Sequence, residues 1–311
     1  MYVVEVNNLV KKYDKKVAVD GISFKLQDKS IVGFLGPNGA GKTTTINAIL
    51  GLVKKNDGKI KIFGKDAERN RLDINRDLGY VPQELAIYKD MSALQNVEFF
   101  GKLYGLKGKE LKIAAKDALE FTGLYDRRKD IAKEFSGGMQ RRLNIACAIV
   151  SKPKLLIMDE PTVGVDPQSR NSILESIVKL NEMGTTILYT SHYMEEVEAI
   201  CKKIYIMDEG HIIAYGSCKE IIANSMEGCH IIIELSDDPR AISEKLKKIE
   251  GVYEVSINEN TINVSYDDTK DSLASAFSQI QSDGFKVMSV KNKTYNLENA
   301  FLKLTGKKLR D

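Results

Sequence analysis

The chain has 311 residues, which is too long for one comfortable hydrophobic core and suits two domains, one of them large. Its 46 basic and 43 acidic residues leave a net charge of +3, and so balanced a surface gives no reason to expect nucleic acid as a partner. No CxxC spacing occurs, so we interpret the four cysteines as reduced, structural residues of a cytosolic protein: Cys147, Cys201, Cys218 and Cys229.

The start of the chain predicts a strand and no targeting segment. Residues 2–6 alternate in polarity, whereas a signal peptide begins with a charged segment followed by an apolar core. No window along the chain approaches the roughly 18 consecutive apolar residues of a membrane-spanning helix. We therefore expect that the chain does not cross a bilayer by itself.

Residues 2–6 and 21–26 predict antiparallel strands that lead into an apolar strand at 30–35. A helix is expected over residues 43–52, ending at Gly51, and short strands at 58–63 and 79–81. Between the strand at 30–35 and this helix lies the pattern GxxxxGK[ST], which is typical of a phosphate-binding loop. The residues expected to hold phosphate are Gly36, Pro37, Asn38, Gly39, Ala40, Gly41, Lys42, Thr43 and Thr44.

The loop has a physical logic that supports this interpretation. Its glycines allow consecutive backbone N–H groups to point into one concavity, and Lys42 adds a positive charge. The N-terminus of the following helix adds partial positive charge where the β-phosphate would lie. Thr43 would place its hydroxyl on Mg²⁺. The alternative, a glycine-rich turn that matches by chance, does not account for the strand and helix on either side.

The middle of the chain changes from strands to helices and back. Residues 85–150 have helical periodicity, notably at 93–104 and 109–121, with Gly105 and Gly123 as stops. Strands are expected again at 155–158, 185–190 and 203–207, with helices at 168–183 and 194–202 between them. This alternation predicts a mainly parallel sheet, with the helical block inserted into it.

Two carboxylates follow the apolar strand at 155–158. Asp159 would hold Mg²⁺, and Glu160 is placed to polarise an attacking water, as phosphoryl transfer requires. By itself an Asp-Glu pair after a strand is more often a loop or a helix cap. Beside a phosphate-binding loop, the catalytic interpretation is favoured.

The segment Ser136-Gly137-Gly138-Met139-Gln140 predicts a second anion site, because two glycines expose backbone N–H groups ahead of a helix expected to begin near Met139. Together with the phosphate loop and Asp159-Glu160, it makes residues 1–225 resemble the ATP-binding subunits of ABC transporters. These segments match that family's signature, Walker A and Walker B motifs. Phe135 stands where the family usually has leucine, and we expect altered packing there rather than lost function.

The resemblance implies a role for several more residues. Tyr13 resembles the aromatic residue that stacks on adenine, with a packed tyrosine at a strand end as the alternative. Gln83 and His192 match the residues that contact the γ-phosphate, and Thr43, Gln83 and Asp159 would be ligands of Mg²⁺. The signature residues Ser136, Gly137, Gly138 and Gln140 would bind ATP held by a second subunit, and Asp166 would meet the opposite phosphate loop.

The C-terminal region predicts a second domain. After a bridging helix past Ser217, the expected order is a strand at 229–235, a helix to 249, strands at 252–257 and 261–266, a helix at 271–283 and a strand at 285–290. This βαββαβ order is that of ferredoxin-like domains. A last amphipathic helix at 297–304 is expected to bury one face, formed by Leu297, Phe301, Leu302 and Leu304, on the body of the protein.

The sequence therefore predicts an α/β P-loop NTPase of the ABC ATPase type at 1–225, with an antiparallel β subdomain and a helical subdomain at about 85–150. An α+β ferredoxin-like domain at 226–311 is expected to follow. Residues 91–106 and the tail at 296–306 resemble ATPases of the ABC-2 type drug and antibiotic exporters. The alternatives are an importer ATPase with a regulatory C-terminal domain and a soluble, non-transport ABC ATPase.

The same resemblance implies the cofactors ATP and Mg²⁺ and two kinds of partner. One is a second ATP-binding subunit, in a homodimer or a heterodimer; the other is a set of separate transmembrane permease subunits. The permease is expected to dock near residues 84–88, where core packing is the alternative explanation of the apolar residues. The expected location is peripheral, on the cytoplasmic face of the cell membrane.

Overall fold

The computed structural model describes residues 1–14, 16–225, 228–267, 270–292 and 295–306. It divides into two compact units, each built around a hydrophobic core of its own: Met1–Cys218, with which Thr305 and Gly306 are grouped, and Lys219–Leu304. This division groups most of helix α8 (Cys218–Ser225) with the second unit. The domain boundary expected from the sequence, at residue 225, would keep α8 in the first domain, and that boundary stays a prediction. None of the helices within the described ranges has both the length and the apolar character needed to cross a membrane.

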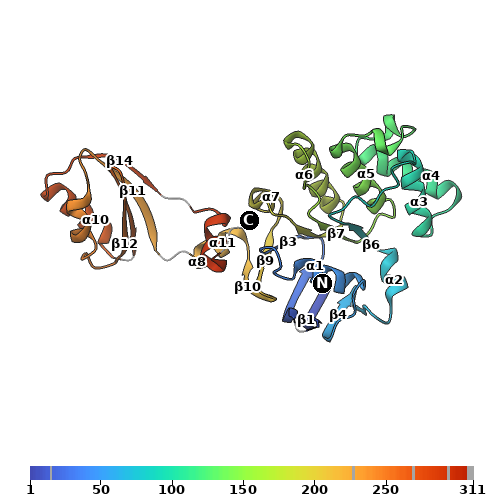
Figure 1. Ribbon diagram of the computed structural model, residues 1–311, viewed down its shortest axis with the longest axis horizontal. Helices are drawn as coiled ribbons and strands as arrows, with labels where there is room; N and C mark the ends of the chain where they lie inside the picture. Colours follow the sequence, from blue (N-terminus) through green and yellow to red (C-terminus); the bar gives the residue numbers. More distant parts are fainter. Residues whose placement is uncertain (15, 226–227, 268–269, 293–294, 307–311) are drawn as a thin grey trace. The chain divides into compact units, whose positions relative to one another are not determined.

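Six strands form the central sheet of the first unit, in the order β10-β9-β3-β8-β7-β6 (Figure 1). The neighbours from β9 to β6 pair in parallel, and β10 pairs antiparallel with β9. All residues of β3, β7 and β8 are buried, as expected for strands covered on both faces. The strands are β3 (Ile31–Leu35), β6 (Leu78–Val81), β7 (Leu155–Asp159), β8 (Thr186–Thr190), β9 (Lys203–Asp208) and β10 (His211–Gly216).

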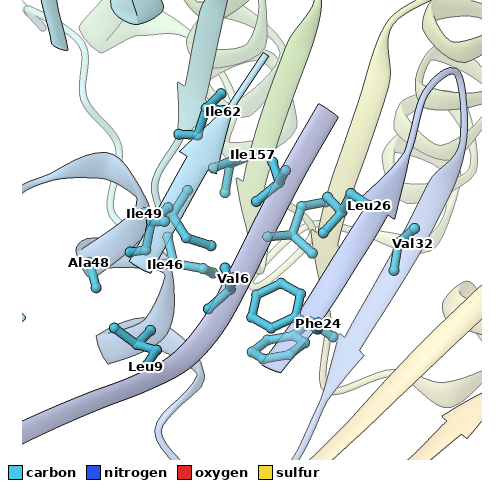
Figure 2. Packing of buried hydrophobic residues seen from close by; sticks show 14 of the residues in the cluster. Val6, Leu9, Phe24, Leu26, Val32, Ile46, Ala48, Ile49, Ile62 and Ile157 are labelled. Atoms are coloured by element: carbon cyan, nitrogen blue, oxygen red, sulfur yellow. The ribbon is translucent and has the colours of Figure 1, made fainter. Parts of the chain in front are cut away.

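An antiparallel sheet, ordered β2-β1-β4-β5, packs against one face of the central sheet together with helix α1 (Lys42–Leu50). Figure 2 shows the shared core, in which Val6 and Phe24 of this sheet lie near Ile46 of α1 and Ile157 of β7. Burying such a side chain stabilises the fold by about 1.5–3 kcal/mol. The strands are β1 (Tyr2–Tyr13), β2 (Lys16–Gln27), β4 (Asp57–Ile62) and β5 (Lys65–Asp66).

The opposite face of the central sheet carries helices α6 (Pro167–Glu182) and α7 (Met194–Ile200) (Figure 1). Strand β3 shows how closely α7 packs. A Cβ atom at Gly33 would lie 2.8 Å from the Cγ1 atom of Val197, so only glycine fits there without a shift.

Three helices make the helical block and pack on one another: α3 (Ala93–Leu103), α4 (Gly108–Phe121) and α5 (Gly137–Ile149). Helix α5 also contacts β6 at the edge of the central sheet. Ser92 begins α3 with a capping box, in which its side chain accepts from the Gln95 N–H group and the Gln95 side chain accepts from the Ser92 N–H group. Two 3₁₀ turns, η1 (Tyr125–Arg127) and η2 (Ala132–Glu134), connect α4 to α5.

The second unit has the predicted βαββαβ order, and its sheet is antiparallel throughout, in the order β12-β13-β11-β14. This confirms the ferredoxin-like topology. Its elements are β11 (Cys229–Leu235), α9 (Arg240–Leu246), β12 (Val252–Asn258), β13 (Thr261–Tyr266), α10 (Ser272–Ser282) and β14 (Val287–Asn292), with α11 (Leu297–Thr305) after them.

Five details of the sequence prediction are wrong. Helix α5 begins at Gly137 rather than near Met139, because Ser136 caps it. Strands β5 and β10 and the short helix α2 (Arg71–Arg76) were not predicted, since each is too short or too exposed to show a clear pattern. Leu302 is 41% exposed and does not share the buried face of α11. That face contains Leu297, Ala300 and Phe301.

Candidate functional site

Of the phosphate-loop residues, 36–41 lie between β3 and α1, and Lys42, Thr43 and Thr44 form the first turn of the helix. Gly41 has a φ of 104°, a left-handed conformation that favours glycine. A Cβ atom there would lie 2.3 Å from the Ala18 carbonyl oxygen, so the loop can lie against β2 only with glycine at this position. Within the loop, Gly36, Pro37 and Ala40 are buried, whereas Asn38 and Gly39 are exposed.

The Lys42 side chain is buried within the loop that it follows. Its ammonium group donates to the carbonyl oxygens of Gly36, at 2.6 Å, and Pro37, at 3.1 Å. Burial lowers the pKa of Lys42, and the negative charges of Glu160 and Asp159 oppose that shift. The ammonium group is therefore held at a fixed place close to both carboxylates.

Asp159 ends strand β7 and is held by two hydroxyl groups. Its Oδ1 atom accepts a 2.6 Å hydrogen bond from Thr190, and its Oδ2 atom lies 3.4 Å from the hydroxyl oxygen of Thr43. Burial raises the pKa of the Asp159 carboxyl; the bond from Thr190 is the largest opposing effect. The pair of Thr43 and Asp159 thus presents hard oxygen atoms at the C-terminal edge of the sheet.

Glu160 has an unusual backbone, with a φ of 50° in the left-handed region that costs a non-glycine residue roughly 1–3 kcal/mol. Its N–H group donates to Thr190, at 3.0 Å to the hydroxyl and 3.2 Å to the carbonyl oxygen, which holds this conformation. Its side chain accepts a 2.8 Å hydrogen bond from the Gln83 amide. The Nε2 atom of His192 lies 2.5 Å from the other carboxylate oxygen.

A cavity of about 340 Å³ joins these groups. Its lining brings together the sequence-predicted residues Tyr13, Asn38, Gly39, Gly41, Lys42, Thr43, Thr44, Gln83, Glu160 and His192, with Lys16 and Ala18 beside them. Tyr13 is half exposed at the end of β1, with the Lys11 ammonium 4.5 Å from its ring centre. The cavity therefore brings one aromatic ring and two lysines together with the carboxylate of Glu160.

The signature residues do not line this cavity and lie instead next to the loop at 161–166, which contains Asp166. The Ser136 hydroxyl caps α5 by accepting from the Met139 N–H group at 3.3 Å, and Ser136 and Gly137 are exposed. Gly138 packs closely on the start of α6: a Cβ atom there would lie 2.5 Å from the hydroxyl oxygen of Ser169 and 3.4 Å from the Oδ2 atom of Asp166. Gln140 donates to the carbonyl oxygens of Ala132 and Phe135 and so secures the turn before the helix.

Asp166 caps α6, and its Oδ1 atom accepts from the Ser169 N–H group at 2.9 Å. This backbone hydrogen bond lowers the pKa of its carboxyl. Asp166 and Ser136 therefore share one exposed region, distinct from the cavity around Lys42.

The donor set fits Mg²⁺ when a nucleotide supplies further oxygen atoms. The hydroxyl of Thr43, the carboxylate of Asp159 and the amide of Gln83 are oxygen-bearing groups of the kind that Mg²⁺ prefers. Within the described ranges, His, Cys, Asp and Glu residues nowhere gather in a group of three that could hold a metal by themselves. A divalent cation at this place would therefore be shared between protein and phosphate.

Two functional candidates were missed from the sequence. Thr190 is fully buried and contacts both Asp159 and Glu160. Arg141 is 5% exposed and donates to the carbonyl oxygens of Pro82, at 3.0 Å, and Gln83, at 2.7 Å, which ties the signature helix to the segment of Gln83. The only sequence signal for them is proximity to a predicted site residue: Arg141 directly follows Gln140, and Thr190 lies two residues before His192.

The chain is similar in sequence and in fold to known proteins. The family model described as "ABC transporter" matches residues 19–163. The "Linearmycin resistance ATP-binding protein LnrL" of Bacillus subtilis (strain 168) is 42% identical over 309 residues, 99% of each chain. A "Nod factor export ATP-binding protein I" of Ralstonia nicotianae is 33% identical, covering 99% of this chain and 95% of its own. A solved structure of an "ATP binding subunit of ABC transporter" has a TM-score of 0.66 at 28% identity, covering 71% of this chain and 92% of its own.

Proposed function

Because the chain belongs to the ABC transporter family, as the ATP-binding and ATP-hydrolysing subunit of an exporter, we propose that residues of its cavity hydrolyse ATP shared with a second subunit. The observation that carries this proposal is the placement of the Glu160 carboxylate. It lies at the end of β7, within contact distance of Gln83 and His192, in the same cavity as Lys42.

Each group in the cavity has a task in this proposal. Lys42 and the backbone N–H groups at the start of α1 bind the phosphates, and Tyr13 stacks on the adenine ring. Glu160 polarises the attacking water and accepts its proton. Gln83 and His192 orient that water and the γ-phosphate, and their contacts with Glu160 fix where its carboxylate points. Thr43, Asp159 and Gln83 would hold Mg²⁺, which supplies neutralising charge to the phosphates when bound.

Ser136, Gly137, Gly138, Gln140 and Asp166 complete the site of the opposite subunit. In support, Ser136 and Gly137 are exposed at the N-terminus of a helix of 13 residues, where backbone N–H groups attract an anion. They lie outside the cavity that contains Lys42, so within one chain they cannot act on the same phosphates. Either a second copy of the chain or a related subunit would supply the other half.

The membrane path belongs to separate permease subunits, and the chain acts as a peripheral protein on the cytoplasmic face of the membrane. In support, relatives aligned over nearly the whole chain are ATP-binding proteins of export and resistance systems. The cargo is of the kind named for those relatives, a compound to be expelled such as linearmycin or a Nod factor. Residues 84–88 beside Gln83, where Tyr88 is 47% exposed, are the proposed docking region for the permease.

The first test replaces the proposed base. Glu160→Gln should bind ATP with unchanged affinity and lower turnover by about 10²- to 10⁴-fold, because an amide cannot accept the proton of the water. A matched control is Glu182→Gln, the same change at an exposed position at the end of α6. Steady-state hydrolysis and nucleotide titration measure both quantities. Normal turnover of Glu160→Gln would show that Glu160 is not the base.

The second test identifies the partner and cargo. Tagged Glu160→Gln protein is purified from detergent-solubilised membranes with Mg-ATP, and its companions are identified. Recovery of a polytopic permease supports a transporter; recovery with ribosomes or nucleic acid supports a soluble role instead. Co-expression with that permease should raise resistance to linearmycin-type compounds, and co-expression of the Glu160→Gln protein should not. If the purified chain instead binds a small molecule at residues 229–291 that inhibits hydrolysis, the importer alternative is favoured.

A further inference from the structure

One buried carboxylate outside the cavity gathers contacts from several functional segments. Glu196 lies on α7 and is 3% exposed. A single oxygen, Oε2, accepts three hydrogen bonds, from the hydroxyl groups of Thr162 at 2.9 Å, Tyr189 at 2.7 Å and Ser191 at 2.5 Å. So dense a set of donors offsets the cost of removing a carboxylate oxygen from water.

A cation completes the network. The Nε atom of Arg170 lies 3.3 Å from the other carboxylate oxygen of Glu196, and its guanidinium lies 3.9 Å from the ring centre of Tyr193. Burial, followed by the charge of Glu196, raises the pKa of Tyr189 well above its usual range, so this phenol remains a donor. The network therefore joins three hydroxyl groups by hydrogen bonds, and one cation by an ion pair, to a single buried carboxylate.

The network fixes the backbone on both sides of His192. Ser191 directly precedes His192, and while its hydroxyl donates to Glu196 it also accepts a 2.9 Å hydrogen bond from the Tyr193 N–H group. Glu196 thus controls the three-residue turn that points His192 at Glu160.

The same carboxylate holds the loop at 161–166. Thr162 lies two residues after Glu160, and its carbonyl oxygen accepts from the Val165 N–H group at 3.2 Å, which closes the turn. At the other end, the Arg170 N–H group donates to the Asp166 carbonyl oxygen at 2.9 Å in the first turn of α6. Both ends of this loop are therefore tied to Glu196, one through Thr162 and the other through Arg170.

We propose that Glu196 is a positioning residue that holds the turn around His192 and the loop at 161–166 in one shared geometry. Closure of the partner subunit on Asp166 then sets the position of His192 at the γ-phosphate. This inference rests on the proposed roles of His192 and Asp166. It assigns to Glu196 no contact with nucleotide, so its effect must pass through these two segments.

The test replaces Glu196 by glutamine. The amide retains the size of the side chain but has one oxygen acceptor and no charge, so it cannot satisfy three hydroxyl groups and Arg170 together. Glu196→Gln should lower kcat by at least about tenfold while KM and the affinity for ATP change less than about twofold. Glu195→Gln, the same change at the exposed neighbouring position, is the control and should keep normal kcat.

A double-mutant cycle separates positioning from general damage. If Glu196 acts through His192, Glu196→Gln combined with His192→Ala should be no slower than the slower single variant. Multiplicative losses, or weakened ATP binding with a lower unfolding temperature, would overturn the proposal. Should Glu196→Gln not fold, Ser191→Ala removes one hydroxyl and keeps the charge, and the same cycle applies. Failure of Glu160→Gln to slow hydrolysis in the same assay would instead contradict the proposed function.

Discussion

At the residue scale, one hydroxyl group organises both carboxylates of the site. Thr190 donates to Asp159 and accepts from the backbone N–H group of Glu160, so a single side chain orients the proposed metal ligand and stabilises the strained backbone of the proposed base. Thr190 is fully buried, and a hydroxyl lost there could not be replaced by solvent without rearrangement.

Thr190→Val tests this role, because valine has nearly the same shape and lacks the hydroxyl. A hydrogen bond to a charged group contributes about 1.5–3 kcal/mol, so the Mg²⁺ concentration needed for half-maximal hydrolysis should rise by at least about tenfold. Mg²⁺ dependence of hydrolysis and Mg²⁺-free nucleotide binding measure the effect. Thr190→Ser keeps the hydroxyl and is the matched control; equal Mg²⁺ dependence of both variants would contradict this role.

At the element scale, the join between β3 and α1 depends on backbone that few residues can adopt. Gly41 combines a left-handed φ with close approach to the Ala18 carbonyl oxygen on β2. Gly39 also has a left-handed φ, of 79°, but among the described residues no atom lies within 4 Å of a Cβ atom built there. The two positions therefore differ in crowding and share the same kind of strain.

Gly41→Ala should abolish ATP binding, because the new methyl group must displace either the phosphate loop or strand β2. Gly39→Ala introduces only the left-handed strain, about 1–2 kcal/mol, and should weaken binding much less. Titration with a fluorescent nucleotide measures both affinities, and circular dichroism checks that both variants fold. Equal losses at the two positions would mean that strain, and not the contact with β2, limits the loop.

At the scale of the whole molecule, the active unit is expected to be a pair of chains. Lys42 and Ser136 lie in separate regions of one chain, so a composite site would take Lys42 from one subunit and Ser136 from the other. This arrangement makes complementation possible between chains that are each inactive.

Mixing a Lys42→Ala chain with a Ser136→Arg chain should restore hydrolysis. Half of the randomly formed dimers contain both variants, and each such dimer has one intact site, so activity should reach about a quarter of the normal value. Hydrolysis measured against mixing ratio should peak at equal amounts. No recovery at any ratio would argue against a head-to-tail dimer.

The second unit should be dispensable for nucleotide binding, because its hydrophobic core is separate and every cavity residue lies between Tyr13 and His192. A chain lacking residues 229–311 should bind ATP with unchanged affinity and show weaker dimer closure or a lower unfolding temperature. Nucleotide titration and thermal unfolding measure the two effects. Loss of ATP binding would show that the boundary between the domains is drawn wrongly.

The fold class and most residues of the cavity were predictable from the amino-acid sequence. Local patterns are enough where the chemistry is local. The phosphate loop needs glycines at fixed, short spacings, a buried parallel strand is a continuous apolar run, and the βαββαβ order follows from alternating periodicities. Glu160, Gln83 and His192 were found because each occupies a motif position, and the cavity does bring them together.

The contacts that hold these residues in place were not predictable and became visible only in the folded chain. Thr190 contacts Glu160, 30 residues away, and Glu196 contacts Thr162, 34 residues away. Arg141 contacts Pro82, 59 residues away. No local sequence pattern encodes contacts over such separations. Short elements such as α2 and β10 were missed for the same reason, because their place depends on neighbours rather than on their own periodicity. Residue chemistry at fixed spacing identifies the reacting groups, whereas burial and long-range hydrogen bonds, which exist only after folding, determine their orientation.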